Sequence, residues 1–392
     1  MRLLFLHGEG RIYIDEKGNF YTAGSYNENI WQRYMNLCDE LVVVLRKNPK
    51  VYSTEYAENN LNRIPSKIKC ICLPDVYKPH KNYFIPKYRK QIKRTLKEEI
   101  KKSDRIIIRS LCDFYANNAY HYCKKFHKRF LVEVIGFEFE QLWVHSKLGK
   151  IIAPFNELRY RLYMKNVEYA VYVTKEGLQK RYPSNGKCLG CSDIEINNHG
   201  DDVLSKRLLR IDKQKKIIVG TAALLDIRCK KQENVVKAIY LLKRKGYTNF
   251  EYQLVGNGSG KRIKKYIDKY DLGDVVRILG QLPHECIDGW LDSIDIYIQP
   301  SYVEGLSRAI GEAMGRACPV ICSDVGCNDE LISKEYMYGK NDVESLANLM
   351  ISLIDKDMQK MAAGQNYEKI KEYNKDVLAP IRGKFYHEFA QE

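Results

Sequence analysis

Short apolar runs alternate with amphipathic stretches along nearly the whole chain, and this alternation constrains the fold more than any other feature. Short apolar runs are typical of strands buried on both faces of a sheet, and apolar residues recurring every three to four positions are typical of helices. Their alternation predicts parallel sheets covered by helices, an α/β class. The expected strands are residues 3–7, 41–45, 68–73, 105–109, 130–135, 170–174 and 194–197, then 217–222, 252–256, 275–279, 294–299 and 319–323; helical patterns cover residues 28–38, 84–102, 155–168, 234–244 and 261–270.

The strands fall into two sets, which predicts two doubly wound domains in a chain of 392 residues. A polar, charged segment, residues 198–216, separates the sets and is the expected boundary. We place an N-terminal Rossmann-like domain at residues 1–200 and a C-terminal one at residues 201–374, with a last helix, residues 375–392, packing back on the first. Ligands of open parallel sheets bind at the carboxyl ends of the strands, so the cleft between the domains is the expected active site.

Charge and cysteine content indicate which partners and which cellular compartment to expect. The chain has 65 basic and 49 acidic residues, a formal net charge of +16, which favours polyanionic partners such as nucleic acid, an anionic membrane face or phosphorylated substrates. A lysine-rich surface without such a partner is the alternative. The twelve cysteines are scattered, mostly in apolar runs, as in a reducing compartment. The first seven residues are too short for a signal-peptide core, and no segment reaches eighteen apolar residues, so we expect a cytoplasmic protein, soluble or peripheral to the membrane.

The segment around residues 301–321 carries the most specific chemistry. An apolar strand, residues 294–299, leads to Glu304 and Gly305, and a helix then runs from Ser307 to about residue 316, with Glu312 inside it. The first backbone N–H groups of a helix have no intrahelical partner and carry partial positive charge, so a helix that starts at a strand end is an anion site. A carboxylate on each side of that site suits a sugar nucleotide, whose diphosphate would take the helix start while the acids hold hydroxyl groups. An ordinary strand–helix unit with two surface glutamates is the alternative.

This segment resembles the E-x7-E signature of retaining glycosyltransferases with the GT-B fold, specifically glycosyltransferase family four. The likeness extends over residues 294–301, Glu-Gly-Leu at 304–306, Glu-Ala-Met at 312–314, Pro-Val-Ile at 319–321 and Asp-Glu-Leu-Ile at 329–332. It is strong over about 180 residues and loose over the rest. The resemblance implies two Rossmann-like domains that face an interdomain cleft.

The resemblance also implies roles on the donor side. Glu304 holds hydroxyl groups of the donor sugar and steadies charge at the anomeric carbon, and Glu312 binds the ribose. Backbone N–H groups from Gly305 through Leu306 to Ser307 hold the diphosphate. The cations and the turn that complete the implied donor site are Arg228, Lys230, Gln281 and Leu282, the last two passing the nucleobase.

Several positions depart from the family pattern. Lys231 stands where relatives usually have glycine, Leu224 where they have arginine, and Ser307 where proline is common. Arg228 is expected to supply the second cation, because a guanidinium makes forked contacts to a diphosphate. A solvated surface cation is the alternative for both Arg228 and Lys230. The glycine-rich turn at residues 256–260 is interpreted as a tight turn with only indirect ligand contact.

The N-terminal half matches more weakly. Many relatives place a glycine-rich loop against the donor phosphates before the first helix, which here points to Gly24, although the usual Gly-Gly pair is missing. Glu138 follows the strand at residues 130–135, where some relatives have a histidine near the acceptor. We expect Glu138 to face the cleft as a catalytic residue in contact with the acceptor; a surface acid is the alternative.

No metal or cofactor is expected. The eight histidines form no pair at a ligand spacing, and no Asp-x-Asp stands at a strand end. Cys188-Leu-Gly-Cys191 has no second ligand pair at a suitable spacing for zinc and lacks the surroundings of a redox pair. Lys230, Arg228 and the helix start at Ser307 would therefore carry the charge of the leaving group.

A basic helix is expected within residues 78–105, which contain eleven Lys and Arg and three acidic residues. Its apolar positions, Ile85, Tyr88, Ile92, Leu96 and Ile100, recur every three to four residues. We expect this stripe to pack on the first sheet. The basic face would lean on anionic lipid at the inner face of the membrane.

The expected function is that of a retaining, metal-independent hexosyltransferase. It would move a sugar from a nucleotide-sugar donor to a hydroxyl group of a lipid-linked or polysaccharide precursor; no nucleic-acid partner is expected. Two alternatives stay open: a non-catalytic GT-B scaffold that binds membrane or a partner transferase, and a sugar-nucleotide epimerase on the same fold.

Overall fold

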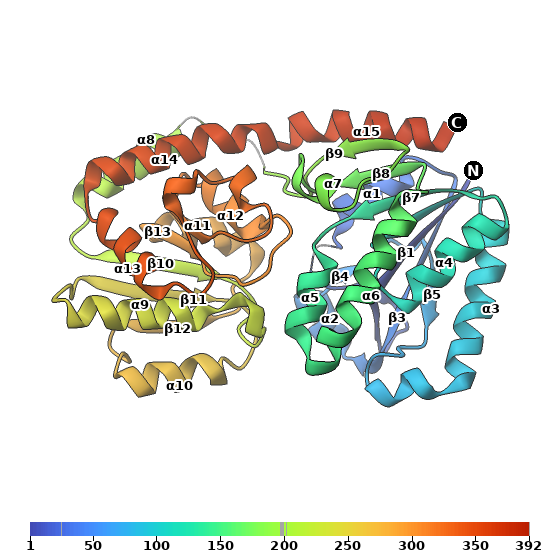
Figure 1. Cartoon of the computed structure of the whole chain (residues 1–392), viewed down its shortest axis with the longest axis horizontal. Helices are drawn as coiled ribbons and strands as arrows, with labels where there is room; N and C mark the ends of the chain where they lie inside the picture. Colours follow the sequence, from blue (N-terminus) through green and yellow to red (C-terminus); the bar gives the residue numbers. More distant parts are fainter. Residues whose placement is uncertain (25, 197–199, 201, 392) are drawn as a thin grey trace.

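The computed structural model describes residues 1–24, 26–196, 200 and 202–391. It contains two sheets, one in each half of the chain, with helices packed around them (Figure 1). The α/β class and the two parallel-sheet domains expected from the alternation of strands and helices are confirmed.

The first sheet has the parallel order β5-β3-β1-β6-β7-β8-β9; β2 pairs antiparallel with the far end of β1, and β4 pairs antiparallel with β2. Its strands are β1 (Arg2–Asp15), β2 (Phe20–Thr22), β3 (Glu40–Tyr52), β4 (Asn62–Arg63), β5 (Lys69–Leu73), β6 (Arg105–Arg109), β7 (Arg129–Val134), β8 (Tyr169–Tyr172) and β9 (Lys187–Gly190). The helices of this half are α1 (Glu28–Met35), α2 (Thr54–Asn60), α3 (Pro86–Lys102), α4 (Phe114–Lys125), α5 (Glu138–His145), α6 (Lys147–Met164) and α7 (Gly177–Arg181), with the 3-10 turn η1 (His80–Phe84).

The second sheet is parallel throughout, in the order β12-β11-β10-β13-β14-β15. Its strands are β10 (Ile217–Ala222), β11 (Phe250–Val255), β12 (Val276–Gly280), β13 (Ile296–Gln299), β14 (Val320–Ser323) and β15 (Met337–Tyr338). Its helices are α8 (Asp202–Lys213), α9 (Gln232–Arg244), α10 (Lys261–Tyr270), α11 (Ile287–Ser293), α12 (Arg308–Gly315), α13 (Val343–Ser352) and α14 (Lys356–Ile370), with the 3-10 turns η2 (Arg228–Lys230), η3 (His284–Cys286), η4 (Asn328–Glu330), η5 (Lys334–Tyr336) and η6 (Lys371–Tyr373), and α15 (Lys375–Gln391) ends the chain.

Several strand predictions needed correction, and β2, β4 and β15 were not expected. β1 extends to Asp15 rather than ending at His7, because its second part pairs with β2 and with the end of β3. The expected strand at residues 194–197 is absent from its described part, where Ile196 makes a single bridge to Asn374. β9 was missed because this edge strand is largely exposed and lacks an apolar run.

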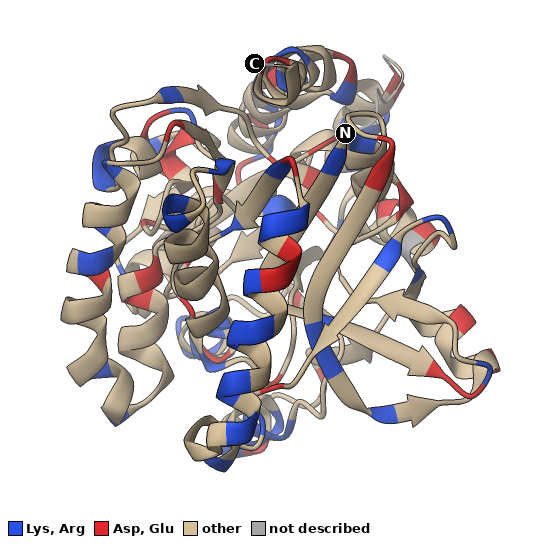
Figure 2. Ribbon diagram, turned by 90° about the vertical axis from the view of Figure 1, so that its right-hand side faces the viewer, with Lys and Arg blue, Asp and Glu red and all other residues tan. Residues whose placement is uncertain are grey.

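α3 packs its apolar stripe on the first sheet, as expected from the sequence. Ile92, Leu96 and Ile100 are buried in the same cluster as Ile106 and Ile108 of β6. Figure 2 looks onto this helix, whose outward turns are largely Lys and Arg. Among the described residues, no helix is both long enough and apolar enough to cross a membrane.

The last helix returns from the second half to the first. α15 extends along the top of the molecule in Figure 1, over the N-terminal half. Phe389 and Tyr386 are buried in the core cluster of Leu3 and Phe5. The Tyr386 hydroxyl donates to Glu133 at 2.6 Å, and the Arg382 guanidinium donates to Glu195 and to the Ser192 carbonyl. This helix therefore couples the end of the chain to its beginning.

Candidate active site

The two halves touch where the loop between β13 and α12 meets the end of β7. A Cβ on Gly305 would lie 2.6 Å from the carbonyl oxygen of Ile135 and 3.2 Å from the Cα of Gly136. On its other side, the carbonyl of Gly305 accepts a hydrogen bond from the amide of Cys327 at 2.9 Å. A glycine is required because both neighbours are backbone, which cannot give way. The carboxyl edges of the two sheets therefore face each other at Gly305.

Glu304, the residue before this contact, is the centre of a hydrogen-bond cluster. Its Oε1 accepts from Lys230 Nζ at 2.6 Å, from Ser301 Oγ at 2.6 Å and from Gln299 Nε2 at 2.9 Å. Its side chain is largely buried, with 11% exposed. Three donors on one oxygen fix the orientation of the carboxylate. The sequence placed Lys230 and Glu304 separately, and the fold brings them together as an ion pair.

The loop that carries Lys230 has an unusual backbone at the next residue. Lys231 has a φ of +53°, in the left-handed region that favours glycine, the residue that relatives usually have there. The loop is tied to the Glu304 loop by a hydrogen bond from the amide of Tyr302 to the carbonyl of Cys229, 2.6 Å long. Arg228 and Leu224 are exposed on the same loop. Lys231 therefore adopts the left-handed backbone conformation that glycine favours. Arg228 lies two residues before Lys230 on this loop.

The start of α12 lies where the sequence predicts an anion site. Ser307 is its N-cap and is buried, but its side chain makes no capping hydrogen bond. The first amides of the helix follow Gly305 and Leu306 directly. Glu312 lies on α12 and is half-buried. Burial first, and then the nearby charges of Glu312 and Glu304, raise the pKa of Tyr297 on β13, so both glutamates lie beside this strand.

The predicted base-reading turn is at the end of β12. Gly280 has a φ of +78°, Gln281 is exposed and accepts a hydrogen bond from Asn257 Nδ2 at 2.8 Å, and Leu282 packs on the second core. The neighbouring glycine-rich turn is held by Asp226, whose carboxylate accepts from the amides of Ser259 and Gly260. That turn is therefore stabilised from within the protein.

Glu138 is buried, with 4% of its surface exposed, so the alternative of a surface acid is wrong. It starts α5, two residues after Gly136. Ser110 Oγ donates to its Oε1 at 2.7 Å. Burial, and then the charge of Glu9, raise the pKa of Glu138 to about 8. Glu138 therefore tends to hold a proton near neutral pH, and in that form it can donate a hydrogen bond.

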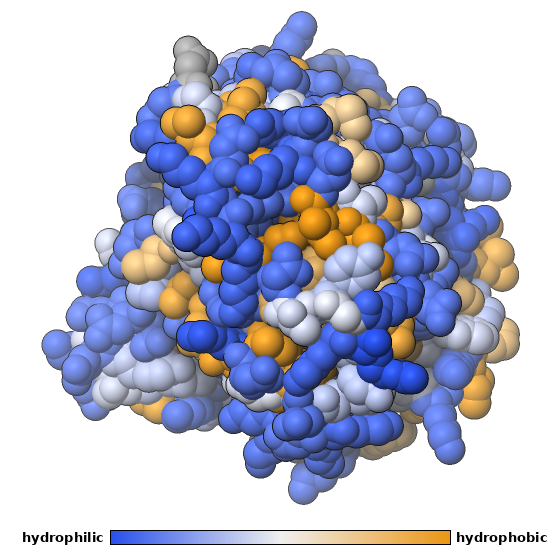
Figure 3. All heavy atoms as spheres, turned by 90° about the vertical axis from the view of Figure 1, so that its left-hand side faces the viewer, coloured by the Kyte–Doolittle hydropathy of each residue, from blue (hydrophilic) through white to orange (hydrophobic). Residues whose placement is uncertain are grey.

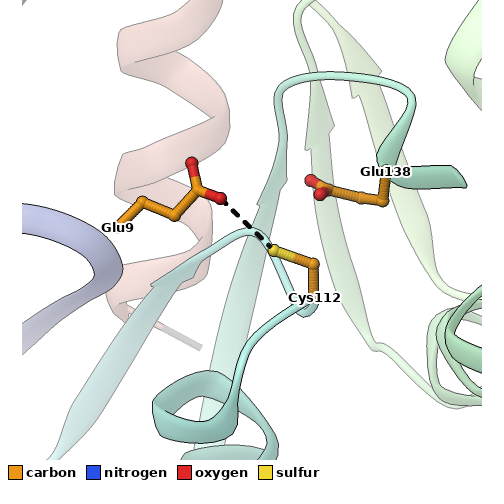
Figure 4. Close-up of side chains that lie close together, drawn as sticks. All are labelled: Glu9, Cys112 and Glu138. Carbon is orange, nitrogen blue, oxygen red and sulfur yellow. Dashed lines mark hydrogen bonds between the residues drawn. The ribbon is translucent and has the colours of Figure 1, made fainter. Parts of the chain in front are cut away.

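Glu9 and Cys112 lie beside Glu138 (Figure 4). One ligand atom from each of the three lies within 4.8 Å of the others, the one such group of His, Cys, Asp and Glu side chains among the described residues that could hold a metal ion. The Cys112 thiol donates to Glu9 Oε1 at 4.0 Å, and burial raises the pKa of this thiol. Glu9 lies within β1, Cys112 follows β6 and Glu138 follows β7. Because they are far apart in sequence, spacing patterns did not reveal that Glu9 and Cys112 lie beside Glu138.

Two further residues at this edge were missed from the sequence. His7 is buried, its Nδ1 is hydrogen-bonded to the Tyr26 hydroxyl, and burial followed by the charge of Arg109 lowers its pKa. Asp113 is the N-cap of α4 and leaves no room for a Cβ at Gly8. The available signals were a histidine at the end of the expected strand 3–7 and an aspartate shortly after the strand at residues 105–109.

Gly24 lies apart from this group. It is exposed, has a φ of +67°, and its carbonyl accepts a hydrogen bond from Asn62 Nδ2 at 3.0 Å, within the N-terminal half. The contacts described for Gly24 thus do not join it to Glu304 or Lys230.

A cavity of about 800 Å³ lies between the halves, behind the Glu304 loop. It is lined by Gly326 and Cys327, which back Glu304 and Gly305, but by none of the predicted donor residues. At its wall, the Glu330 carboxylate accepts from the amides of Lys175, Glu176 and Gly177 at 2.6, 3.0 and 3.0 Å. This contact links the halves.

Comparisons with known proteins agree with this arrangement. Residues 205–376 match the family model described as glycosyl transferases group 1. The chain is 32% identical to Protein CapJ of Staphylococcus aureus over 393 residues, covering 98% of this chain and 94% of that protein. It is 27% identical to the putative colanic acid biosynthesis glycosyltransferase WcaL of Escherichia coli K12, covering 52% of this chain and 50% of that protein.

Solved structures share the fold at low identity. Sucrose-phosphate synthase of Thermosynechococcus elongatus superimposes with a TM-score of 0.67 at 17% identity, covering 99% of this chain and 98% of the other. HepE of Anabaena, solved in complex with UDP-glucose, has a TM-score of 0.66 at 14% identity and is covered completely, as is this chain.

Proposed function

Because this chain belongs to the group 1 glycosyltransferases, with the GT-B fold, we propose that it transfers a hexosyl group from a nucleotide sugar to a hydroxyl group of a lipid-linked or polysaccharide precursor, with retention of anomeric configuration. The observation that carries the proposal is the ion pair of Glu304 and Lys230 beside the start of α12. The names of WcaL and of the UDP-glucose complex of HepE support the choice of acceptor and donor.

The geometry around Glu304 supports the proposed donor site. Lys230, with Arg228 and the amides of Gly305 to Ser307, stabilises the diphosphate as negative charge develops on it during transfer. Glu304 holds hydroxyl groups of the donor sugar, and Glu312 holds the ribose. Gln281 and Leu282 lie at the turn that would pass the base. Such preorganised charges stabilise a transition state because they need no reorientation during the reaction.

Glu138 is the proposed contact to the acceptor. It lies in the first half, close to the place where Gly136 meets Gly305. Its pKa is raised to about 8, so it holds its proton at pH values below this. A protonated carboxyl can donate to the acceptor and an ionised one can accept from its hydroxyl group. We propose that Gly24 belongs to a loop that closes on the donor, although its described contacts do not join it to Glu304 or Lys230.

A screen of nucleotide sugars for thermal stabilisation tests the donor. A true donor raises the melting temperature because it binds the folded state. Transfer to a lipid-linked or oligosaccharide acceptor, followed by NMR of the product, then reports the anomeric configuration. No stabilisation by any nucleotide sugar would refute the proposed donor class, and an inverted product would refute retention.

We also propose that the reaction needs no metal ion, because Lys230 and Arg228 can stabilise the leaving group. Activity should therefore survive EDTA. A loss of activity in EDTA that manganese or magnesium restores would refute this, and Glu9, Cys112 and Glu138 would then be the candidate metal ligands.

We also propose peripheral association with the inner face of an anionic membrane, since the chain has a net charge of +16.

The second candidate is a scaffold that has lost catalysis. Leu224, exposed where relatives have an arginine, favours it. Calorimetry separates the two: an enzyme binds its nucleotide sugar and turns it over, whereas a scaffold does not turn it over.

A further inference from the structure

α6 presents its large apolar side chains to the outside. Phe155 is 73% exposed and Ile151 66% exposed. The face toward the protein carries Gly149, Ala153 and Asn156 in its first part, and Tyr160 and Met164 in the core near its end. A surface helix normally turns its large apolar stripe to the core. α6 therefore packs on the core through Tyr160 and Met164, while a second set of large apolar side chains stays exposed.

The stripe continues onto α5, which lies beside α6 (Figure 1). Gly149 allows this close approach, because a Cβ there would meet the carbonyl of Leu142. Trp143 is exposed at the end of α5 and stacks on Phe139 at 5.3 Å between ring centroids. We call the exposed set the α5–α6 apolar face; its members are Trp143, Val144, Leu148, Ile151, Ile152, Phe155, Leu158 and Leu162.

The face is concentrated, since its eight side chains come from twenty consecutive residues, 143–162. Large exposed apolar patches on soluble domains mark contacts with proteins or membranes. Elsewhere, exposed apolar side chains are more scattered, and hydrophilic residues cover most of the face of the C-terminal half that Figure 3 shows.

Cations surround the α5–α6 apolar face. Lys147, Lys150 and Lys165 are exposed, and Lys150 Nζ lies 5.7 Å from the centre of the Trp143 ring. Residues 141–165 contain five Lys and Arg and one acid, Glu157, which is buried. Long basic side chains can reach from an apolar face to anionic headgroups. α3 differs, because its cations are exposed while its apolar stripe is buried.

We propose that the α5–α6 apolar face inserts into the headgroup region of an anionic membrane, with α6 lying in the membrane plane. Basic residues beside a broad apolar stripe are typical of helices that bind in this way. α5 begins two residues after Gly136, which meets Gly305 in the cleft. Insertion therefore holds the acceptor side of the cleft near the membrane, where a lipid-linked acceptor lies; this consequence rests on the proposed function.

Trp143 is a built-in reporter of insertion. The chain has three tryptophans, and the other two, Trp31 and Trp290, are buried. Adding vesicles of phosphatidylglycerol and phosphatidylcholine to the full chain should shift the emission to shorter wavelength, and brominated lipids should quench it. No shift and no quenching would overturn the proposal, whatever the variants below do.

Co-sedimentation with the same vesicles tests the face itself. The variant Ile151→Gln/Phe155→Gln/Leu158→Gln should bind at least tenfold more weakly than the native protein. The control Leu209→Gln/Val377→Gln/Ile381→Gln removes three exposed apolar side chains from α8 and α15 and should change binding less than twofold. Binding by the native protein should also persist in part at 0.5 M salt, because insertion is not screened. Equal binding by both variants would overturn the proposal.

Two measurements separate other outcomes. If the native protein is a dimer in solution that the α6 variant converts to a monomer, and neither binds vesicles, the face is an interface between copies and the proposal is wrong. Thermal stabilisation by nucleotide sugars without vesicles tests the proposed function independently. The α6 variant should keep that stabilisation in full, which also shows that it is folded.

Discussion

At the residue scale, the candidate site depends on side chains whose neighbours set their charge. Glu304 accepts three hydrogen bonds on one oxygen, whereas Glu138 is buried beside a second acid, which raises its pKa to about 8. Two carboxyl groups with different environments can thus have different roles across one cleft. This difference leads to two predictions.

Glu304→Gln should lower kcat at least a hundredfold and leave the melting temperature nearly unchanged. A hundredfold loss corresponds to about 2.7 kcal/mol of transition-state stabilisation, within the range for one preorganised electrostatic contact. Steady-state kinetics with the identified donor measures it. Glu344→Gln, an exposed glutamate on α13, is the matched control. Turnover within threefold of the native enzyme would contradict the assigned role.

Glu138→Gln should flatten the dependence of stability on pH. The folded pKa of about 8 lies above the ordinary value of 4.5, so between these values the folded state binds more protons than the unfolded state. The free energy of unfolding therefore falls as pH rises through this window, by at most about 1.4 kcal/mol per pH unit. Denaturation at pH 5, 7 and 9 measures this. The free energy of unfolding of the variant should increase relative to that of the native protein as pH rises.

Glu9 and Asp113 face the same site, and burial raises the pKa of Asp113 to about 6. Some pH dependence should therefore remain in the variant. Parallel pH profiles for the native protein and Glu138→Gln would show that Glu138 ionises normally.

At the element scale, the carboxyl edge of the first sheet is held by buried ion pairs. Arg109, at the end of β6, pairs with Glu133 of β7 at 2.8 Å and with Asp193 at 2.5 Å. The hydroxyl groups of Tyr34 and Tyr386 also donate to Glu133. β6, β7, α1 and α15 thus meet at one buried carboxylate.

Arg109→Met should destabilise the fold by about 3–5 kcal/mol, because it leaves Glu133 buried without its cation and removes one of the cations that pair with Asp193. Chemical denaturation measures the loss. Lys180→Met is the comparison: it removes an exposed cation paired with Glu176 and should not change the denaturation midpoint measurably. A loss below about 1 kcal/mol for Arg109→Met would mean that the other cations nearby replace it.

At the scale of the whole molecule, α15 and the Glu330 contact hold the halves together. α15 continues from the second half onto the core of the first. Glu330 accepts three amide hydrogen bonds from residues 175–177 across the boundary. The first link is a large apolar contact, whereas the second is small and polar, so the second is the one expected to open.

Glu330→Ala should favour a more open arrangement of the halves without unfolding either. We expect a larger radius of gyration in solution scattering and a KM for the donor raised at least threefold, because the closed cleft is less populated. Glu335→Ala, an exposed acid in the same region, should change neither. An unchanged scattering curve and KM would show that α15 alone holds the halves.

The sequence by itself determined the class of fold and the local arrangement of the residues in the proposed donor site. Apolar periodicity is local, and the elements from residue 294 to 321 follow one another without interruption, so Glu304, Gly305 and Ser307 could be placed at a strand end and a helix start. Only the tertiary structure brought Lys230 to Glu304, and Glu9 and Cys112 to Glu138, because contacts between distant strand ends leave no trace in spacing. It also decided which apolar side chains of α6 are buried: Tyr160 and Met164 reach the core, whereas Ile151 and Phe155 stay exposed, a choice that depends on how the helix packs against its neighbours.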